Sequence, residues 1–165
     1  MTANVLTMFK LIAIAIAVFS FTQQLSEPPD IWATPVPYFE VQREFQAPIT
    51  LRGQGHRGVD FLVETQGPIQ SPTAGTMHFA GKVVDENYLT IKTTAGLLVS
   101  FAGTCSALAE GAYISKGQVI GFECASEVGS EAHCPSCSHM SVRSDHGYLN
   151  PELFLGLVHP SVIKS

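Results

Sequence analysis

The chain has 165 residues, a formal net charge of −5, and charged side chains at only 14% of its positions. This balance argues against nucleic acid or an anionic membrane surface as the main partner, because both attract clustered Lys and Arg side chains. The length suits one domain of ordinary size with enough chain to bury a hydrophobic core.

The N-terminus contains an apolar run, Leu11 to Phe21, that follows Lys10 and precedes a polar stretch. This run is shorter than the ~20 residues of a membrane-spanning helix, and it fits the apolar core of a secretory signal. We therefore expect residues 1–25 to be a signal peptide, and the protein to be secreted or to lie in the cell envelope outside the cytoplasm. No clean Ala-x-Ala cleavage site follows, so an uncleaved N-terminal membrane anchor is the alternative.

The next segment, residues 26–45, is rich in proline, with Pro28, Pro29, Pro35 and Pro37 close together. Prolines at this density favour extended chain, which predicts a linker or an arm along the edge of the domain. The domain itself is then expected over residues 46–165.

The middle of the chain consists of β-branched and aromatic runs separated by short polar or glycine-containing turns, a pattern typical of consecutive antiparallel hairpins. The expected strands are residues 75–84, 88–93, 97–102, 112–115 and 118–122. Only one helix is predicted, with Asn150 as its N-cap, Pro151 at its first position, Glu152 at its positive end and Leu153 to Val158 as its apolar face. We therefore predict an all-β domain with a short C-terminal helix.

All four cysteines, Cys105, Cys124, Cys134 and Cys137, lie in the second half of the chain. An exported protein usually oxidises such residues, so one or two disulfides are expected, with three pairings open. A cysteine zinc site is less favoured because such sites have two close pairs of ligands, and here only Cys134 and Cys137 are close.

Two short segments contain candidate metal ligands, Gly-His-Arg-Gly-Val-Asp over residues 55–60 and Cys-Ser-His-Met over residues 137–140. His56, Asp60 and His139 supply two imidazoles and one carboxylate, a ligand set that leaves zinc an open position for water. Residues four apart in a strand lie ~13 Å apart, so His56 and Asp60 can share a metal only if the backbone bends between them. Gly58 lies at that place. Cys137 is two residues before His139 and therefore faces the same side of a strand.

These segments, together with Ser71 to Thr76, Phe79 to Gly81 and Gly111 to Gly121, occur in an order that resembles the LytM/lysostaphin-type zinc endopeptidases of bacterial cell walls. The run Gly-Gln-Val-Ile-Gly within the last of them also occurs in biotin and lipoyl carrier domains. Those carriers present a modified lysine on a hairpin, usually beside methionine, and this chain has no such turn. The first segment and Tyr148 to Pro151 further resemble short exported family members from actinobacteria.

The resemblance implies a β-sandwich-like core of antiparallel strands, with a groove that holds zinc on His56, Asp60 and His139. It also implies that the protein acts on peptide bonds of peptidoglycan. Zinc chemistry would follow from a bound water of lowered pKa and a polarised scissile carbonyl.

The sequence departs from the family at two positions where active members carry proton-transferring histidines. One is Cys137, two residues before the last ligand, and the other is Gly103, in the stretch Phe-Ala-Gly-Thr. A Cys137 thiolate could serve as a base unless it is in a disulfide. His133 lies in the same cysteine-rich segment and could reach the site, although a solvated loop histidine is the favoured interpretation. His78 reads as a residue on the face of a strand.

Two functions are therefore predicted as alternatives. The first is an exported zinc endopeptidase-like protein that cleaves peptides of peptidoglycan. The second is a catalytically degenerate envelope protein that binds murein or regulates a partner hydrolase through the same groove.

Overall fold

The structure is a computed structural model that describes residues 31–50, 53–124 and 137–158. The expected signal or anchor, His133 and Cys134 lie outside the described residues. Within them, no helix is both long and apolar enough to cross a membrane.

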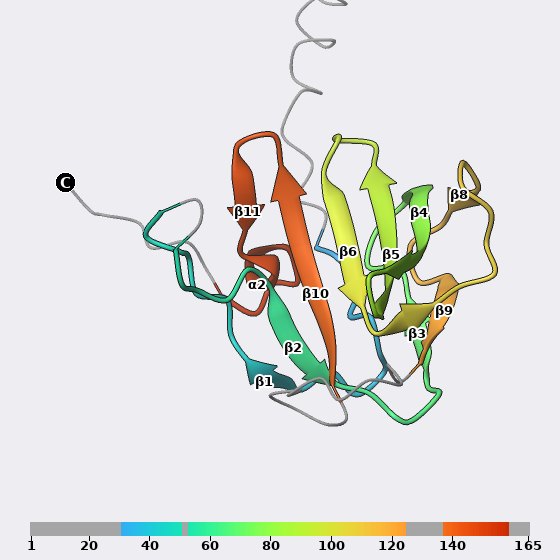
Figure 1. Ribbon diagram of the computed structural model, residues 1–165, viewed down its shortest axis with the longest axis horizontal. Helices are drawn as coiled ribbons and strands as arrows, with labels where there is room; N and C mark the ends of the chain where they lie inside the picture. The colour runs from blue at the N-terminus through green and yellow to red at the C-terminus, as the bar shows by residue number, and fades with distance from the viewer. Residues whose placement is uncertain (1–30, 51–52, 125–136, 159–165) are drawn as a thin grey trace, which may run out of the picture. The chain divides into compact units, whose positions relative to one another are not determined.

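Two antiparallel sheets make up the domain (Figure 1). The large sheet has the order β1 (Val41–Arg43), β2 (Val59–Leu62), β10 (Cys137–Ser144), β6 (Leu98–Ala102), β5 (Glu86–Thr93), β4 (Gly75–Val83) and β8 (Tyr113–Ile114), with β11 (Gly147–Leu149) paired to β10. The small sheet has the order β3 (Pro68–Gln70), β9 (Val119–Glu123) and β7 (Thr104–Cys105). The one described helix is α2 (Pro151–Phe154), so the prediction of an all-β core with a short C-terminal helix is confirmed.

Alternation along the strands gives the large sheet one buried face and one open face. In β10, Met140 and Val142 are fully buried, whereas His139 and Ser141, which alternate with them, are partly exposed. Each large apolar side chain buried in this way contributes about 1.5–3 kcal/mol. The fully buried core residues come from both sheets: Val59, Phe61, Ile69, Leu89, Ile91, Val99, Phe101, Ile114, Met140 and Val142.

The helix is shorter than its sequence predicts. Asn150 is the N-cap, since its side-chain oxygen accepts a hydrogen bond from the Glu152 N–H at 2.9 Å. The helix ends at Phe154 with Leu155 as C-cap, and Gly156 follows with φ of 68°. A left-handed glycine at this place stops a helix, so the expected apolar helical face up to Val158 was wrong.

Residues 31–45 belong to the same compact unit as the rest of the domain, which begins at Ile31. Trp32 and Val36 are buried, and the Trp32 ring stacks on Phe154 with centroids 4.5 Å apart. The boundary expected at residue 46 therefore falls inside the structural unit. Prolines keep this segment extended, but its apolar side chains pack as part of the core.

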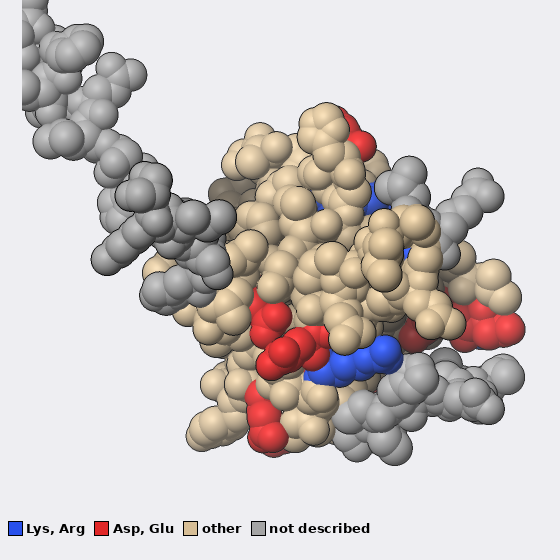
Figure 2. Space-filling model, turned by 90° about the vertical axis from the view of Figure 1, so that its left-hand side faces the viewer, with Lys and Arg blue, Asp and Glu red and all other residues tan. Residues whose placement is uncertain are grey.

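The arm leads into β1, the edge strand of the large sheet. Glu40, Arg43 and Glu44 are exposed on and beside this strand. Figure 2 shows the corresponding side of the molecule, where a group of acidic and basic side chains lies in the lower part of a mostly uncharged surface. Charged side chains at an open edge discourage pairing with a second chain.

Candidate metal centre

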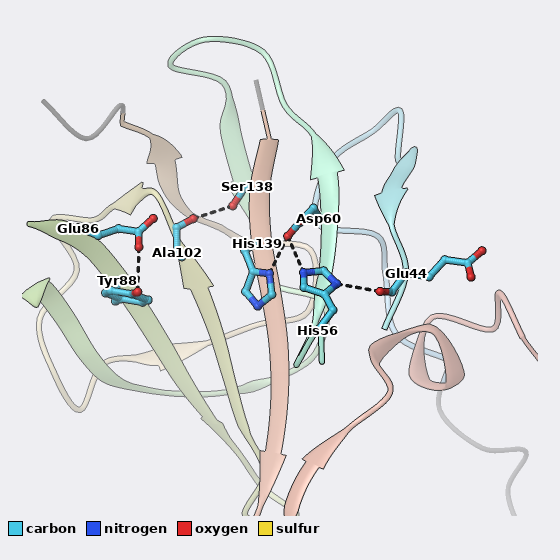
Figure 3. A network of polar contacts seen from close by, with 8 residues as sticks. All are labelled: Glu44, His56, Asp60, Glu86, Tyr88, Ala102, Ser138 and His139. Atoms are coloured by element: carbon cyan, nitrogen blue, oxygen red, sulfur yellow. Dashed lines mark hydrogen bonds and ion pairs between the residues drawn. The ribbon is translucent and has the colours of Figure 1, made fainter. Parts of the chain in front are cut away.

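Three residues from two strands and the turn before β2 converge at one end of the large sheet (Figure 3). Asp60 on β2 and His139 on β10 are direct cross-strand neighbours. His56 precedes β2 and exchanges two backbone hydrogen bonds with Gln46, both 2.9 Å. Backbone pairing therefore fixes all three positions. We call His56, Asp60 and His139 the triad.

The polar atoms of the triad face one another closely. Asp60 Oδ1 lies 3.0 Å from His56 Nε2 and 2.7 Å from His139 Nδ1. One potential ligand atom from each residue lies within 4.8 Å of the others, as a shared metal ion requires. The two imidazole rings meet edge to face, with centroids 4.9 Å apart.

The hydrogen bond behind His56 decides which of its nitrogens is available to a ligand. His56 Nδ1 lies 2.8 Å from the Glu44 carbonyl oxygen, which can only accept, so Nδ1 is the donor. In the neutral ring, Nε2 then carries a lone pair directed at the Asp60 carboxylate. Two acceptors at 3.0 Å repel unless a proton or a metal ion lies between them. The bond from Nδ1 to the Glu44 carbonyl oxygen is also typical of metal-bound histidines, which usually donate their other ring N–H to an acceptor.

Asp60 is well suited to hold positive charge. Burial raises the pKa of the Asp60 carboxyl. The hydrogen bond from His139 and the charges of His56 and His139 lower it by more, so the pKa lies below its usual value. The carboxylate is thus the favoured form, as a metal ligand must be.

Gly58 has a different role from the one its sequence position suggests. The chain does bring His56 and Asp60 to one site, but Gly58 is not among the glycines with left-handed backbone. A Cβ atom at Gly58 would instead lie 2.6 Å from His139 Nε2 and would also collide with the Met140 carbonyl oxygen. The position requires glycine because β10 passes too close for any side chain.

Contacts of the Arg57 side chain stabilise the turn that contains His56. The Arg57 guanidinium donates to the Gly53 carbonyl oxygen at 3.0 Å and lies over the Tyr148 ring, 5.9 Å from its centroid. These contacts join the turn to β11. Stable placement of His56 therefore depends on the C-terminal hairpin as well as on β2.

The two positions where the family resemblance predicts histidine carry no group that can transfer a proton. Cys137 is disulfide-bonded, and a disulfide sulfur has no thiol that could act as a base. Gly103 has a φ of 70° and open space around its Cα atom. His78 is exposed on β4 and lines a hollow at another part of the sheet, so it does not join the triad.

Sequence reasoning did not identify Tyr88 as part of this surface. The register places Tyr88, Ala102, His139 and Asp60 side by side across β5, β6, β10 and β2. The Tyr88 hydroxyl donates to Glu86 Oε2 at 2.8 Å (Figure 3). Burial, and then the hydrogen bond and charge of Glu86, raise the pKa of Tyr88 to about 12, so its phenol stays protonated at neutral pH.

A model of peptidase family M23 matches residues 54–151. No curated protein sequence matches the chain.

Several solved structures have similar folds. The catalytic domain of the antimicrobial peptidase lysostaphin from Staphylococcus simulans has a TM-score of 0.59 and 20% identity, over 72% of this chain and 92% of that one. A zinc-containing peptidase from Vibrio cholerae has a TM-score of 0.59 and 19% identity, over 76% of this chain and 40% of that one. A chain from the complex of SpoIIIAH and SpoIIQ has a TM-score of 0.60 and 18% identity, over 74% of this chain and 99% of that one. At these identities the likeness shows the fold.

Proposed function

The chain belongs to peptidase family M23, and on that premise we propose that it is an exported, zinc-binding protein of the cell envelope that acts on peptide bonds of peptidoglycan. The observation that carries the proposal is the triad, with two imidazole nitrogens and one carboxylate oxygen within 4.8 Å of one another. Three protein ligands of this kind leave one position for water or substrate, as in catalytic zinc sites.

The triad fits zinc by its donor chemistry. Two ligand atoms on one tetrahedral zinc lie about 3.3 Å apart, given bond lengths of ~2.0–2.1 Å. The observed separations of 3.0 and 2.7 Å need only small side-chain movements to meet this value. Bound zinc would supply a Lewis acid and a water of lowered pKa.

The residues of the chain have separate roles in this proposal. Glu44 orients His56 through its carbonyl oxygen, and Gly58 lets the His139 ring lie against the start of β2. Asp60 supplies the negative charge that offsets the metal. Tyr88 supplies a protonated phenol on the same face, and its hydroxyl proton is donated to Glu86.

The substrate class and the location follow from the family and the N-terminus. M23 peptidases act on peptidoglycan, which lies outside the cytoplasm. We place the same function on this chain, with residues 1–25 as the export signal or membrane anchor and with His56, Asp60 and His139 as the zinc ligands.

A second candidate function is supported by Gly103 and Cys137. Neither can move a proton, because one has no side chain and the other is oxidised. The open face around the triad could then bind murein, or a partner hydrolase, without cleavage. One structurally similar chain was solved in a complex with another protein.

The test is incubation of the zinc-loaded full chain with purified peptidoglycan, followed by identification of new peptide termini by mass spectrometry. An Asp60→Asn variant is the matched control, because it keeps the shape of the side chain and removes its charge. New termini only with intact Asp60 are the expected result. Absence of termini from a folded, zinc-loaded chain would contradict peptidase activity and support the binding role.

A further inference from the structure

The open face of the large sheet is organised in three rows across β10, β6 and β5. The first row consists of His139, Ala102 and Tyr88, and it lies at the end of the sheet that holds the triad. The second row, Ser141, Ser100 and Thr90, carries only hydroxyl groups. Arg143, Leu98 and Lys92 form the third row, which is cationic at both ends. Opposed residues in antiparallel strands share a face, so the three rows form one continuous surface.

The third row opens into a hollow at the end of the sheet away from the triad. The β5–β6 and β10–β11 turns lie together at this end of the sheet (Figure 1). The hollow has a volume of about 560 Å³, and its basic lining residues are His78, Lys92, Arg143 and His146. We call this hollow the basic pocket.

The basic pocket concentrates positive charge on an acidic protein. The whole chain has nine Lys and Arg side chains and a net charge of −5, yet two of the nine meet here. Asp145 is the one acidic residue in the lining, so the two cations outnumber it before the two imidazoles are considered.

The two cations have no visible structural task. Lys92 and Arg143 are both exposed, and no hydrogen bond or ion pair to either side chain occurs among the described residues. The guanidinium offers a planar pair of donors that matches a carboxylate, the ammonium adds a point charge, and the imidazoles add N–H donors. Such a set is suited to a planar anion.

We propose that the basic pocket binds a free carboxylate of a peptide that lies along the open face with its scissile bond at the triad. Arg143 is four residues from His139 along β10, a distance of about 13 Å. An extended peptide covers about 3.3–3.6 Å per residue, so the carboxylate lies about four residues from the bond at the triad. The hydroxyl row lies between the two ends, where Thr90 and Ser100 are hydrogen-bonded at 2.9 Å. This inference rests on the proposed function, since it assigns one subsite of the same substrate.

The probe is the set of soluble muropeptides released from peptidoglycan by a muramidase and labelled with a fluorophore at their amines. Binding to the zinc-loaded full chain is measured by fluorescence polarisation. A second batch, with every carboxylate converted to an amide, tests whether the carboxylate is the recognised group. Cleavage is scored by mass spectrometry of the same samples.

The pocket variant is Lys92→Gln with Arg143→Gln. Its matched control is Lys82→Gln with Lys116→Gln, which removes two exposed charges that lie outside the pocket and away from the triad, and changes the net charge equally. We expect the pocket variant to bind the unmodified muropeptides about 10-fold more weakly, and the control to stay within about twofold of the parent chain. The amidated peptides should bind the parent chain as weakly as the unmodified peptides bind the pocket variant.

Equal binding by the parent chain and the pocket variant would overturn the proposal, as would an equal loss in the control or tight binding of amidated peptides. Unfolding midpoints of both double variants verify that each remains folded. Carboxylate-dependent binding without new termini would contradict the peptidase and leave the pocket assignment intact. New termini with unchanged binding in the pocket variant would contradict the pocket alone.

Discussion

Gly58 lies directly against the ring of His139. A Cβ atom on Gly58 would be 2.6 Å from His139 Nε2, and the Met140 carbonyl oxygen lies in the same space. Side-chain atoms essentially never approach so closely, so one of the strands would have to move. The close approach of the chain before β2 to β10 is what brings the two histidines of the triad together.

Replacement of Gly58 by alanine should disturb both the fold and the metal site. We expect Gly58→Ala to lower the free energy of unfolding by about 1–3 kcal/mol, as overpacking does. Displacement of the His139 ring should weaken zinc binding by about 10- to 100-fold, the range typical of lost support for a ligand. Urea unfolding and a competition titration with a zinc-binding dye measure the two effects.

The control for this substitution is Gly81→Ala on β4. A Cβ atom there would meet only the far edge of the Phe79 ring at 3.3 Å, and this flexible side chain can move. Zinc affinity should therefore remain that of the parent chain. If Gly58→Ala also bound zinc as tightly as the parent, the steric account of the site would be wrong.

The stability of the metal-free chain should depend on the ionisation of Asp60. The pKa of Asp60 is lowered below 3.8 in the folded state, where His139 and His56 surround the carboxylate. Its contribution is therefore complete above the unfolded-state pKa and is lost as the pH falls through the lower folded-state value. Urea unfolding of chelator-treated protein at a series of pH values from about 6 to about 2.5 should show a stability loss that is smaller in Asp60→Asn. Parallel curves for the two proteins would show that the carboxylate contributes nothing.

Local sequence patterns predicted some strands and the hairpins of β4, β5 and β6, but not the rest of the pairing. The expected pairing of residues 112–115 with 118–122 was wrong, because β8 pairs with β4, and β9 pairs with β3 and β7. The β-branched runs predicted β4, β5 and β6 to within about two residues, because alternation and turn residues are local properties. The position of Tyr88 beside the triad depends on the register of four strands. Only the folded chain determines that register.

The error at the end of the helix has an identifiable cause. The helix was extended to Val158 although Gly156 marks a typical stop, so this signal was present and was overlooked. The prolines of residues 26–45 predicted a linker or an arm along the edge of the domain, and from Ile31 onward this segment belongs to the same compact unit as the domain. Trp32, buried against Phe154, shows that a few apolar side chains outweighed that pattern.

The triad was identified from motif order, but the reason for its central glycine was not. The expected bend between His56 and Asp60 suggested that Gly58 is needed for its backbone freedom. In the structure, Gly58 is needed because a side chain at this position would collide with β10. Space requirements of this kind come from a strand about eighty residues away in the sequence, which no local pattern reveals.

The disulfide between Cys105 and Cys124 should stabilise the small sheet without affecting the metal site. It joins the end of β7 to the residue after β9, across a sequence separation of 19. A variant with Cys105→Ser and Cys124→Ser should lose about 2–4 kcal/mol of unfolding free energy. Serine substitution is preferable to a reductant, because Cys137 is also disulfide-bonded. Zinc affinity should be unchanged, since the triad lies in the large sheet, and a marked loss would show that the two sheets are coupled.

The strongest test of catalytic competence is to supply the two missing imidazoles. Gly103→His combined with Cys137→His should raise the rate of peptidoglycan cleavage by about 10²-fold or more if the rest of the site is intact, because each proton-transfer group typically contributes 10²–10⁴-fold. Gly103 has open space for a side chain, although its φ of 70° will cost about 1–2 kcal/mol of stability in any other residue.

The matched control for that variant is Gly103→Ala with Cys137→Ser, which imposes the same backbone strain and breaks the same disulfide without adding an imidazole. A gain in rate by the histidine variant over this control, measured by release of new peptide termini at equal zinc occupancy, would show that proton transfer alone limits the parent chain. Equal rates in the two variants would show that the triad does not present a peptide bond for cleavage. The binding role would then account for the triad and the open face better than hydrolysis does, because binding requires neither of the two missing histidines.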